Sequence, residues 1–288
     1  MTTAVQEKVG VQITPLTELT GSRVDGIDLR APVDESTKEL LIDTLVERCC
    51  LVFPNQNLTP DEYIEAVRIF AEPVEQNYSL YHLEGYPLIN KVSNEQLGPE
   101  GKRVYHSSYW HTDHTNREAP PNYTVLHAIK MPDQGGETGV LNTRAAYEAL
   151  PEAVKKKIDK LQTFNVQKGS AARLASLKQV MDKDWKQFEK PMPHPLVRTH
   201  PISGKKAVYF HRGKVENMTG MTPQESQDLI DELDVLLEKP EFIYKHAWSI
   251  GDVLIWDNRQ ALHRAYPNFD LEQHRLLYRI ITEGSKPF

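Results

Sequence analysis

The chain has 288 residues, of which 39% are hydrophobic and 26% are charged, and its formal net charge is −6. This balance is typical of a globular protein with a sizeable core, and 34 basic against 40 acidic residues give no basic stripe for nucleic acid. No apolar run approaches the roughly 18 residues that span a bilayer, and residues 1–10 lack the apolar stretch of a signal peptide. The two cysteines, Cys49 and Cys50, are adjacent, which excludes a framework of disulfides. We therefore expect a cytoplasmic protein without membrane or nucleic-acid partners.

The N-terminal part predicts short strands and two helices. Residues 11–29 read as two short strands joined by a turn, and a helical spacing of leucines follows Ser36. Residues 51–54 form an apolar run that proline ends, typical of a buried strand. Thr59 and Glu62 flank a proline and predict a helix start with a capping box.

The segment from residue 72 to residue 109 is rich in Tyr, Asn, Gly and Pro, and it contains one clear strand at residues 88–92. A long irregular segment of this kind is typical of a loop that covers an active site. Tyr81, His82 and Asn94 are the polar or aromatic side chains in it that we expect to contact a substrate.

The remainder of the chain alternates short strands with a few helices. Helices are expected with Thr143 as a cap, after Pro151, weakly over 170–181, and from Thr222, whereas 185–195 reads as a loop. Strands are expected at residues 123–129, 164–167, 196–200, 207–210, 242–248, 253–256 and 274–282. With no linker or internal repeat, this order predicts one domain over residues 1–288, mostly β with inserted helices and a double-sheet jelly-roll core.

A candidate metal motif stands at His111 and Asp113. In an extended strand, residues at i and i+2 point to the same face, so both side chains would enter one cavity. A distant histidine, His263, would complete the facial triad of two histidines and one carboxylate that non-haem Fe(II) oxygenases use. The same three residue types also suit zinc. A zinc hydrolase and a non-catalytic metal-binding jelly roll are therefore alternatives.

Four motifs together resemble the taurine dioxygenase family, which includes the phenoxyacetate-herbicide dioxygenases. In chain order they are Trp110-His111-Thr112-Asp113, Gly135-Gly136-Glu137-Thr138, Trp256-Asp257-Asn258-Arg259 with His263, and the pair Arg275 and Arg279. The resemblance covers residues 11–284. It implies an Fe(II)- and 2-oxoglutarate-dependent oxygenase on a double-stranded β-helix.

The resemblance also implies roles for individual residues. His111, Asp113 and His263 resemble the iron ligands. Thr138 resembles the hydroxyl that contacts 2-oxoglutarate, and Arg275 the guanidinium that binds its far carboxylate. Arg279 resembles the arginine that holds the anionic group of the substrate. Glu137 replaces the aspartate that the family often has, and residues 78–108 depart from the family's substrate-contacting loop.

The two arginines are four residues apart in one predicted strand. They would share a face about 13 Å apart at ~3.3 Å per residue, a separation that suits two different anions. Arginine binds carboxylates through a planar fork and stays charged. Thr138 and the arginine pair therefore favour the oxygenase over both alternatives.

The expected function is oxidation of a C–H bond in a small anionic molecule, with Fe(II), 2-oxoglutarate and O2 as cofactor and co-substrates and with release of succinate and CO2. A sulfonate, an aryloxy acid or an amino-acid-derived carboxylate would fit. The same centre serves desaturation and cyclisation, which the sequence does not separate from hydroxylation. Asp113 occupies the position that halide would need, which disfavours a halogenase. The polar loops are compatible with a homo-oligomer.

Overall fold

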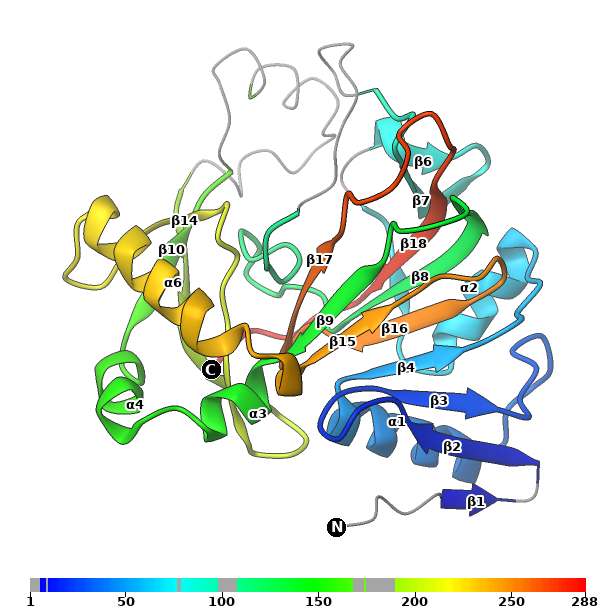
Figure 1. Cartoon of the computed structure of the whole chain (residues 1–288), viewed down its shortest axis with the longest axis horizontal. Coiled ribbons are helices and arrows are strands. Elements are labelled where there is room, and N and C mark those ends of the chain that lie inside the picture. The colour runs from blue at the N-terminus through cyan, green and yellow to red at the C-terminus, as the bar shows by residue number, and fades with distance from the viewer. Residues whose placement is uncertain (1–5, 9, 77–78, 98–107, 168–173, 175–189) are drawn as a thin grey trace.

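The computed structural model describes residues 6–8, 10–76, 79–97, 108–167, 174 and 190–288. Its largest element is a ten-stranded sheet, which runs diagonally through Figure 1. Nine of its strands follow one another in the order β1 (Gln6–Lys8), β2 (Val11–Pro15), β3 (Ser22–Asp25), β4 (Cys50–Phe53), β16 (Val253–Asp257), β8 (Tyr123–Lys130), β18 (Leu276–Thr282), β7 (Tyr86–Ser93) and β6 (His82–Leu83). The tenth, β5 (Pro73–Val74), pairs with β18.

A smaller antiparallel sheet lies over one face of the large one (Figure 1). Its strands are β15 (Ile243–His246), β9 (Thr138–Asn142) and β17 (Ala261–Ala265), in that order. Val140 and Ala261 from this sheet share a buried cluster with Leu126, Trp256 and Leu277 from the large sheet. Two sheets packed face to face around an apolar interior confirm the expected jelly-roll core.

The two faces of the large sheet are separated by the period-two alternation of its central strands. Val125, Ile255 and Ile280 face outward and pack with the helices α1 (Glu35–Arg48) and α2 (Pro60–Arg68). The residues that alternate with them point inward, toward the small sheet. Alternation of this kind therefore decides which side chains of β8, β16 and β18 can line an internal pocket.

A third group of elements packs beside the jelly roll. It has its own apolar core, to which α6 contributes Leu229 and Leu233. Its helices are α3 (Thr143–Glu148), α4 (Glu152–Ile158), α6 (Pro223–Leu237) and the 3-10 turn η3 (Pro240–Phe242). Its strands are β10 (Gln162–Asn165), β11 (Met192–Pro195), β12 (Val197–Thr199), β13 (Lys206–Val208) and β14 (Val215–Met218).

The helix starts at Thr59 and Thr222 are confirmed, each with a complete capping box. The expectation that Thr143 caps α3 is wrong. Asn142 is the cap, because its Oδ1 accepts the backbone N–H of Ala145 at 2.9 Å, while the Thr143 hydroxyl donates to the carbonyl of Gln260.

Several strands differ from expectation. In the described parts of residues 72–109, which are 72–76, 79–97 and 108–109, the chain is more regular than expected, since β6 and β7 form a hairpin that extends the large sheet, after the 3-10 turn η1 (Ser79–Tyr81). Residues 192–195 form β11 rather than a loop. The strands β9, β14 and β17 have no counterpart in the expected set.

The weak helix expected at 170–181 falls outside the described residues apart from position 174. No helix in the described ranges combines the length and the apolar character that crossing a membrane requires.

Candidate active site

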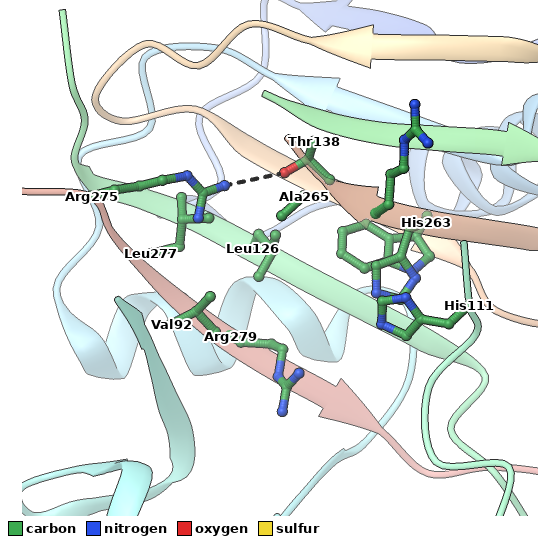
Figure 2. A pocket seen from close by; sticks show the side chains of 11 residues that line it. Val92, His111, Leu126, Thr138, His263, Ala265, Arg275, Leu277 and Arg279 are labelled. Atoms are coloured by element: carbon green, nitrogen blue, oxygen red, sulfur yellow. Dashed lines mark hydrogen bonds between the residues drawn. The ribbon is translucent and has the colours of Figure 1, made fainter. Parts of the chain in front are cut away.

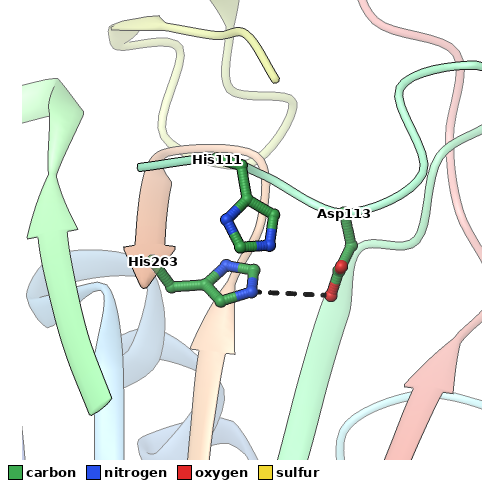
Figure 3. A group of neighbouring side chains, drawn as sticks. All are labelled: His111, Asp113 and His263. Carbon is green, nitrogen blue, oxygen red and sulfur yellow. Dashed lines mark ion pairs between the residues drawn. The ribbon is translucent and has the colours of Figure 1, made fainter. Parts of the chain in front are cut away.

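Two histidines and an aspartate converge between the two sheets. The candidate ligand atoms of His111, Asp113 and His263 all lie within 4.8 Å of one another (Figure 3). His263 comes from β17, but His111 forms only an isolated bridge, and Asp113 lies in a turn. The expectation that His111 and Asp113 share one strand is therefore wrong, although the structure brings both side chains into the same space.

Backbone and side-chain hydrogen bonds orient the three groups. The backbone N–H of His111 donates to the carbonyl of His263 at 3.1 Å, and the backbone N–H of His263 donates to the carbonyl of His111 at 2.8 Å. Nδ1 of His111 is bonded to the carbonyl of Tyr109 at 2.9 Å, which turns Nε2 toward the site. The hydroxyl of Thr124 donates to Oδ2 of Asp113 at 2.7 Å, so one carboxylate oxygen is held.

The charge states of the three groups suit a divalent cation. Burial lowers the pKa of His111 and of His263, so both imidazoles are neutral at neutral pH. Burial opposes ionisation of Asp113, but positive charge beside it, with Arg279 the permanent cation, holds the pKa of this carboxyl well below its usual value. Nδ1 of His263 is buried and has no hydrogen-bond partner among the described residues. Two neutral nitrogens and one carboxylate facing one space are the donor set of a non-haem Fe(II) centre.

A pocket extends from the histidines between the two sheets. Figure 2 shows His111 and His263 at one end and Arg275 with Thr138 at the other. Leu126 and Ala265 lie between the two ends. The remaining lining residues are Val92, Trp256, Arg264, Leu277 and Arg279. The pocket is thus apolar in its middle, with two candidate metal-binding histidines at one end and a cation at the other.

Arg275 is buried, with 5% of its surface exposed. Its Nε donates to the carbonyl of Gly136 at 2.9 Å, and one terminal nitrogen lies 3.5 Å from the Thr138 hydroxyl. That hydroxyl also accepts a hydrogen bond from the indole of Trp248 at 3.0 Å. No carboxylate in the described ranges forms an ion pair with Arg275. Burial lowers its pKa to about 10, so the guanidinium remains charged and available to an anionic ligand.

Gly136 permits this arrangement. Its φ is +72°, and a Cβ there would lie 3.2 Å from Cδ and Nε of Arg275. A side chain would therefore strain the backbone and press on the guanidinium. The close packing of Arg275 against Gly136 therefore explains why the second position of the Gly-Gly motif is a glycine.

Arg279 lies on β18 and lines the same pocket as Arg275. Arg275 precedes the strand rather than belonging to it, so the expectation of one strand carrying both is wrong. The prediction that both face one pocket is confirmed. Nε and one terminal nitrogen of Arg279 donate to Oε1 of Gln76 at 3.0 and 2.7 Å, and another terminal nitrogen lies 3.9 Å from Asp113.

Tyr81, His82 and Asn94 are not among the residues that line the pocket. His82 is bonded through Nε2 to the carbonyl of Gln76 at 2.8 Å. Asn94 accepts the backbone N–H of Arg275 at 2.9 Å, so it fixes the position of that arginine. Contact of these three residues with a substrate stays a prediction.

Sequence reasoning missed Thr124 and Gln76, which hold the candidate ligand Asp113 and the pocket arginine Arg279. Thr124 had one usable signal, since it lies in a predicted strand at the same alternation as Leu126 and so faces inward. Gln76 carries no such signal, because it follows a two-residue strand and reaches Arg279 only through the pairing of β5 with β18.

A comparison of the sequence with protein-family models assigns the chain to a family. The model of the taurine catabolism dioxygenase TauD, TfdA family matches residues 12–281. The chain belongs to this family. Among TauD/TfdA relatives, an alkylsulfatase of Acinetobacter baylyi is 30% identical over 99% of this chain and 89% of its own length. The 2,4-dichlorophenoxyacetate dioxygenase of Cupriavidus pinatubonensis is 30% identical over 95% of this chain and 98% of its own.

Solved structures agree with this assignment. A taurine dioxygenase from Burkholderia xenovorans superposes with a TM-score of 0.80 at 29% identity, covering 96% of this chain and 91% of that one. Relatives in the TauD/TfdA family are named α-ketoglutarate-dependent dioxygenases. The chain is therefore a dioxygenase that depends on α-ketoglutarate, which is 2-oxoglutarate, and on O2.

Proposed function

We propose that this TauD/TfdA dioxygenase uses Fe(II) and 2-oxoglutarate to oxidise a C–H bond of a small anionic molecule, with release of succinate and CO2. The observation that carries the proposal is the arrangement of one pocket, with His111 and His263 at one end and buried Arg275 with Thr138 at the other. A five-carbon diacid needs a metal for its oxo-acid end and a cation for its far carboxylate. The pocket offers both.

In this proposal each residue has a defined task. His111, Asp113 and His263 hold Fe(II), which when bound supplies the activation of O2. Arg275 binds the far carboxylate of 2-oxoglutarate through the guanidinium nitrogens that Gly136 leaves available. The aliphatic side chains in the middle of the pocket pack against the methylene groups and exclude water from them.

Arg279 is the residue that we assign to the anionic group of the substrate. It lines the pocket, stays close to Asp113, and is bonded to the neutral amide of Gln76. A cation beside the metal site would anchor one end of a substrate while a carbon a few bonds away is held at the metal. Relatives are named for sulfate esters, sulfonates and phenoxy acids, which supports a sulfonate, a sulfate ester or an aryloxy acid here.

The test is to add Fe(II) and then 2-oxoglutarate to the protein under anaerobic conditions. We expect a visible metal-to-ligand charge-transfer band, and a shift of this band when an anion of the right class binds. Taurine, an alkyl sulfate and phenoxyacetate, each with the alcohol that lacks its anionic group as control, sample the three classes. Absence of any band with both Fe(II) and 2-oxoglutarate present would contradict the proposal.

A further inference from the structure

Arg279 is held at the pocket by a single amide, the side chain of Gln76. Oε1 of Gln76 accepts from Nε and Nη2 of Arg279 at 3.0 and 2.7 Å, and its Nε2 donates to the backbone carbonyl of the same arginine at 3.1 Å. Gln76 is 1% exposed, and the pairing of β5 with β18 brings it to this position. Because an amide has one accepting end and one donating end, these three bonds fix the orientation of both the amide and the guanidinium.

The contact with Gln76 leaves one end of the guanidinium available. Nε and Nη2 face the amide, whereas Nη1 lies 3.9 Å from Oδ1 of Asp113, a candidate metal ligand. Within the described ranges, Nη1 donates no hydrogen bond. The two terminal nitrogens of a guanidinium form a planar fork that matches an oxyanion such as a carboxylate. The available end therefore lies beside the candidate metal site, where it can bind an anionic group.

A second buried amide lies beside the first. Asn90 is opposite Arg279 in the ladder between β7 and β18, and its Nδ2 donates to Oε1 of Gln76 at 3.1 Å. Asn90 is 1% exposed, and its Oδ1 has no hydrogen-bond partner in the described part of the chain. Among the described residues, Asp113 is the one carboxylate within ion-pair distance of Arg279, and the proposed function assigns it to the metal. The two amides thus direct the arginine without cancelling its charge.

Arg259 shows the alternative in the same chain. Its Nε and one terminal nitrogen both donate to the carboxylate of Asp257 at 2.7 Å, which makes a buried ion pair. The same edge of the guanidinium meets a carboxylate in Arg259 and an amide in Arg279. A glutamate at position 76, which has the length of a glutamine, would give Arg279 an ion pair of its own.

We propose that Gln76 determines the charge of the substrate that the site accepts. As a neutral amide it orients Arg279 and leaves its charge for a substrate anion, whereas a carboxylate at this position would compete with that anion. Gln76 is a positioning residue in this proposal, since it acts through Arg279 and touches neither the substrate nor the metal. The inference rests on the proposed function, in which Arg279 binds the anionic group of the substrate.

The test compares Gln76→Glu with Gln76→Met on the protein loaded with Mn(II) and N-oxalylglycine, an inert stand-in for Fe(II) and 2-oxoglutarate. Isothermal titration calorimetry measures the Kd of taurine, hexyl sulfate and phenoxyacetate, and the anion that wild type binds most tightly is carried forward. We expect Gln76→Glu to raise its Kd about tenfold or more, which is the effect of one lost charge-assisted contact. Gln76→Met should raise it less, because Arg279 keeps its charge. A merely structural role predicts the reverse order, since glutamate has the shape of glutamine and methionine has not.

Gln56→Glu is the matched control for a buried negative charge. Gln56 is 6% exposed and its Oε1 accepts the backbone N–H of Leu29 at 2.9 Å, but it does not line the pocket. Gln56→Glu should leave the Kd of the anion unchanged. If Gln76→Glu does not fold, Asn90→Asp takes its place, because it puts a negative charge on the residue opposite Arg279. Asn90→Asp should weaken binding of the same anion.

Three results would overturn the inference. The first is a wild-type protein that binds none of the three anions. The second is a Gln76→Glu variant, or Asn90→Asp in its place, that binds the anion as tightly as wild type does. The third is a Gln76→Met variant that binds the anion no more tightly than Gln76→Glu. Each result leaves the iron and 2-oxoglutarate chemistry of the proposed function standing if wild type still gives the charge-transfer band, whereas absence of that band overturns the proposed function itself.

Discussion

Replacement of Thr124 by valine removes one hydroxyl and keeps the shape of the side chain. That hydroxyl donates to Oδ2 of Asp113 at 2.7 Å and accepts from the amide of Asn258 at 2.8 Å. Asn258 in turn accepts from the indole of Trp256 at 3.0 Å. Thr124 is therefore the last member of a buried chain of hydrogen bonds that ends on Asp113, the carboxylate that we propose as a metal ligand.

The expected effect follows from these contacts. A hydrogen bond to a charged group contributes about 1.5–3 kcal/mol, and loss of a partner behind a metal ligand typically weakens metal binding 10- to 100-fold. We therefore expect Thr124→Val to raise the Kd for Mn(II) by about 10- to 100-fold. The assay is a titration of the metal-free protein in which free Mn(II) is measured by electron paramagnetic resonance.

A matched control exists in the same chain. Thr163 on β10 is equally buried, accepts from the amide of Asn165 at 2.9 Å, and donates to the carbonyl of His194 at 3.3 Å. Thr163→Val should lower the free energy of unfolding by a similar amount to Thr124→Val without changing the Kd for Mn(II). If Thr124→Val bound Mn(II) within twofold of wild type, the reasoning about Asp113 would be refuted.

Four further outcomes are expected. Arg275→Gln should raise the KM for 2-oxoglutarate about 10- to 150-fold, because a charge-assisted contact of about 1.5–3 kcal/mol is lost, and an unchanged KM in steady-state kinetics contradicts the assignment. Arg279→Ala should raise the substrate KM and the ratio of succinate to oxidised product, and equal ratios would make this arginine structural. Arg259→Met leaves the fully buried carboxylate of Asp257 with His200 as its other partner, so urea unfolding should show a loss of about 3–5 kcal/mol, and a loss below 1 kcal/mol argues against that ion pair. The pKa of Asp257 lies below its ordinary value through Arg259 and His200, against the effect of burial, so the wild-type protein should lose this stabilisation as pH falls below about 4.

Much of the fold could be predicted because its local signals are strong. The capping boxes at Thr59 and Thr222 fix two helix starts, and the apolar runs of β8 and β16 mark buried central strands. The strands β9 and β17 escaped prediction for a physical reason. They carry Thr138 and His263 toward the pocket, and a strand that lines a polar site lacks the apolar alternation that identifies strands.

The residues of the candidate site also fall into those that the sequence could predict and those that it could not. His111, Asp113 and His263 could be named from residue types and motif order, yet the two residues of the first motif do not lie in a strand, and a turn brings Asp113 to the metal side. Residues that act through tertiary contacts could not be named. Gln76 is an ordinary glutamine in the sequence, and its hydrogen bond to Arg279 depends on how the segment after β5 packs against β18.

The pairing of β9 with β17 places two residues of the proposed site on one rigid pair of strands. Ala265 pairs with Thr138, and His263 pairs with Val140, so the backbone ladder fixes the span from the His263 ring to the Thr138 hydroxyl. Arg279, the residue that we assign to the substrate anion, lies outside this ladder, on β18. Substitutions around Arg279 can therefore change which anion is bound without moving His263 relative to Thr138, so that one scaffold can acquire new substrates while its proposed co-substrate site stays in place.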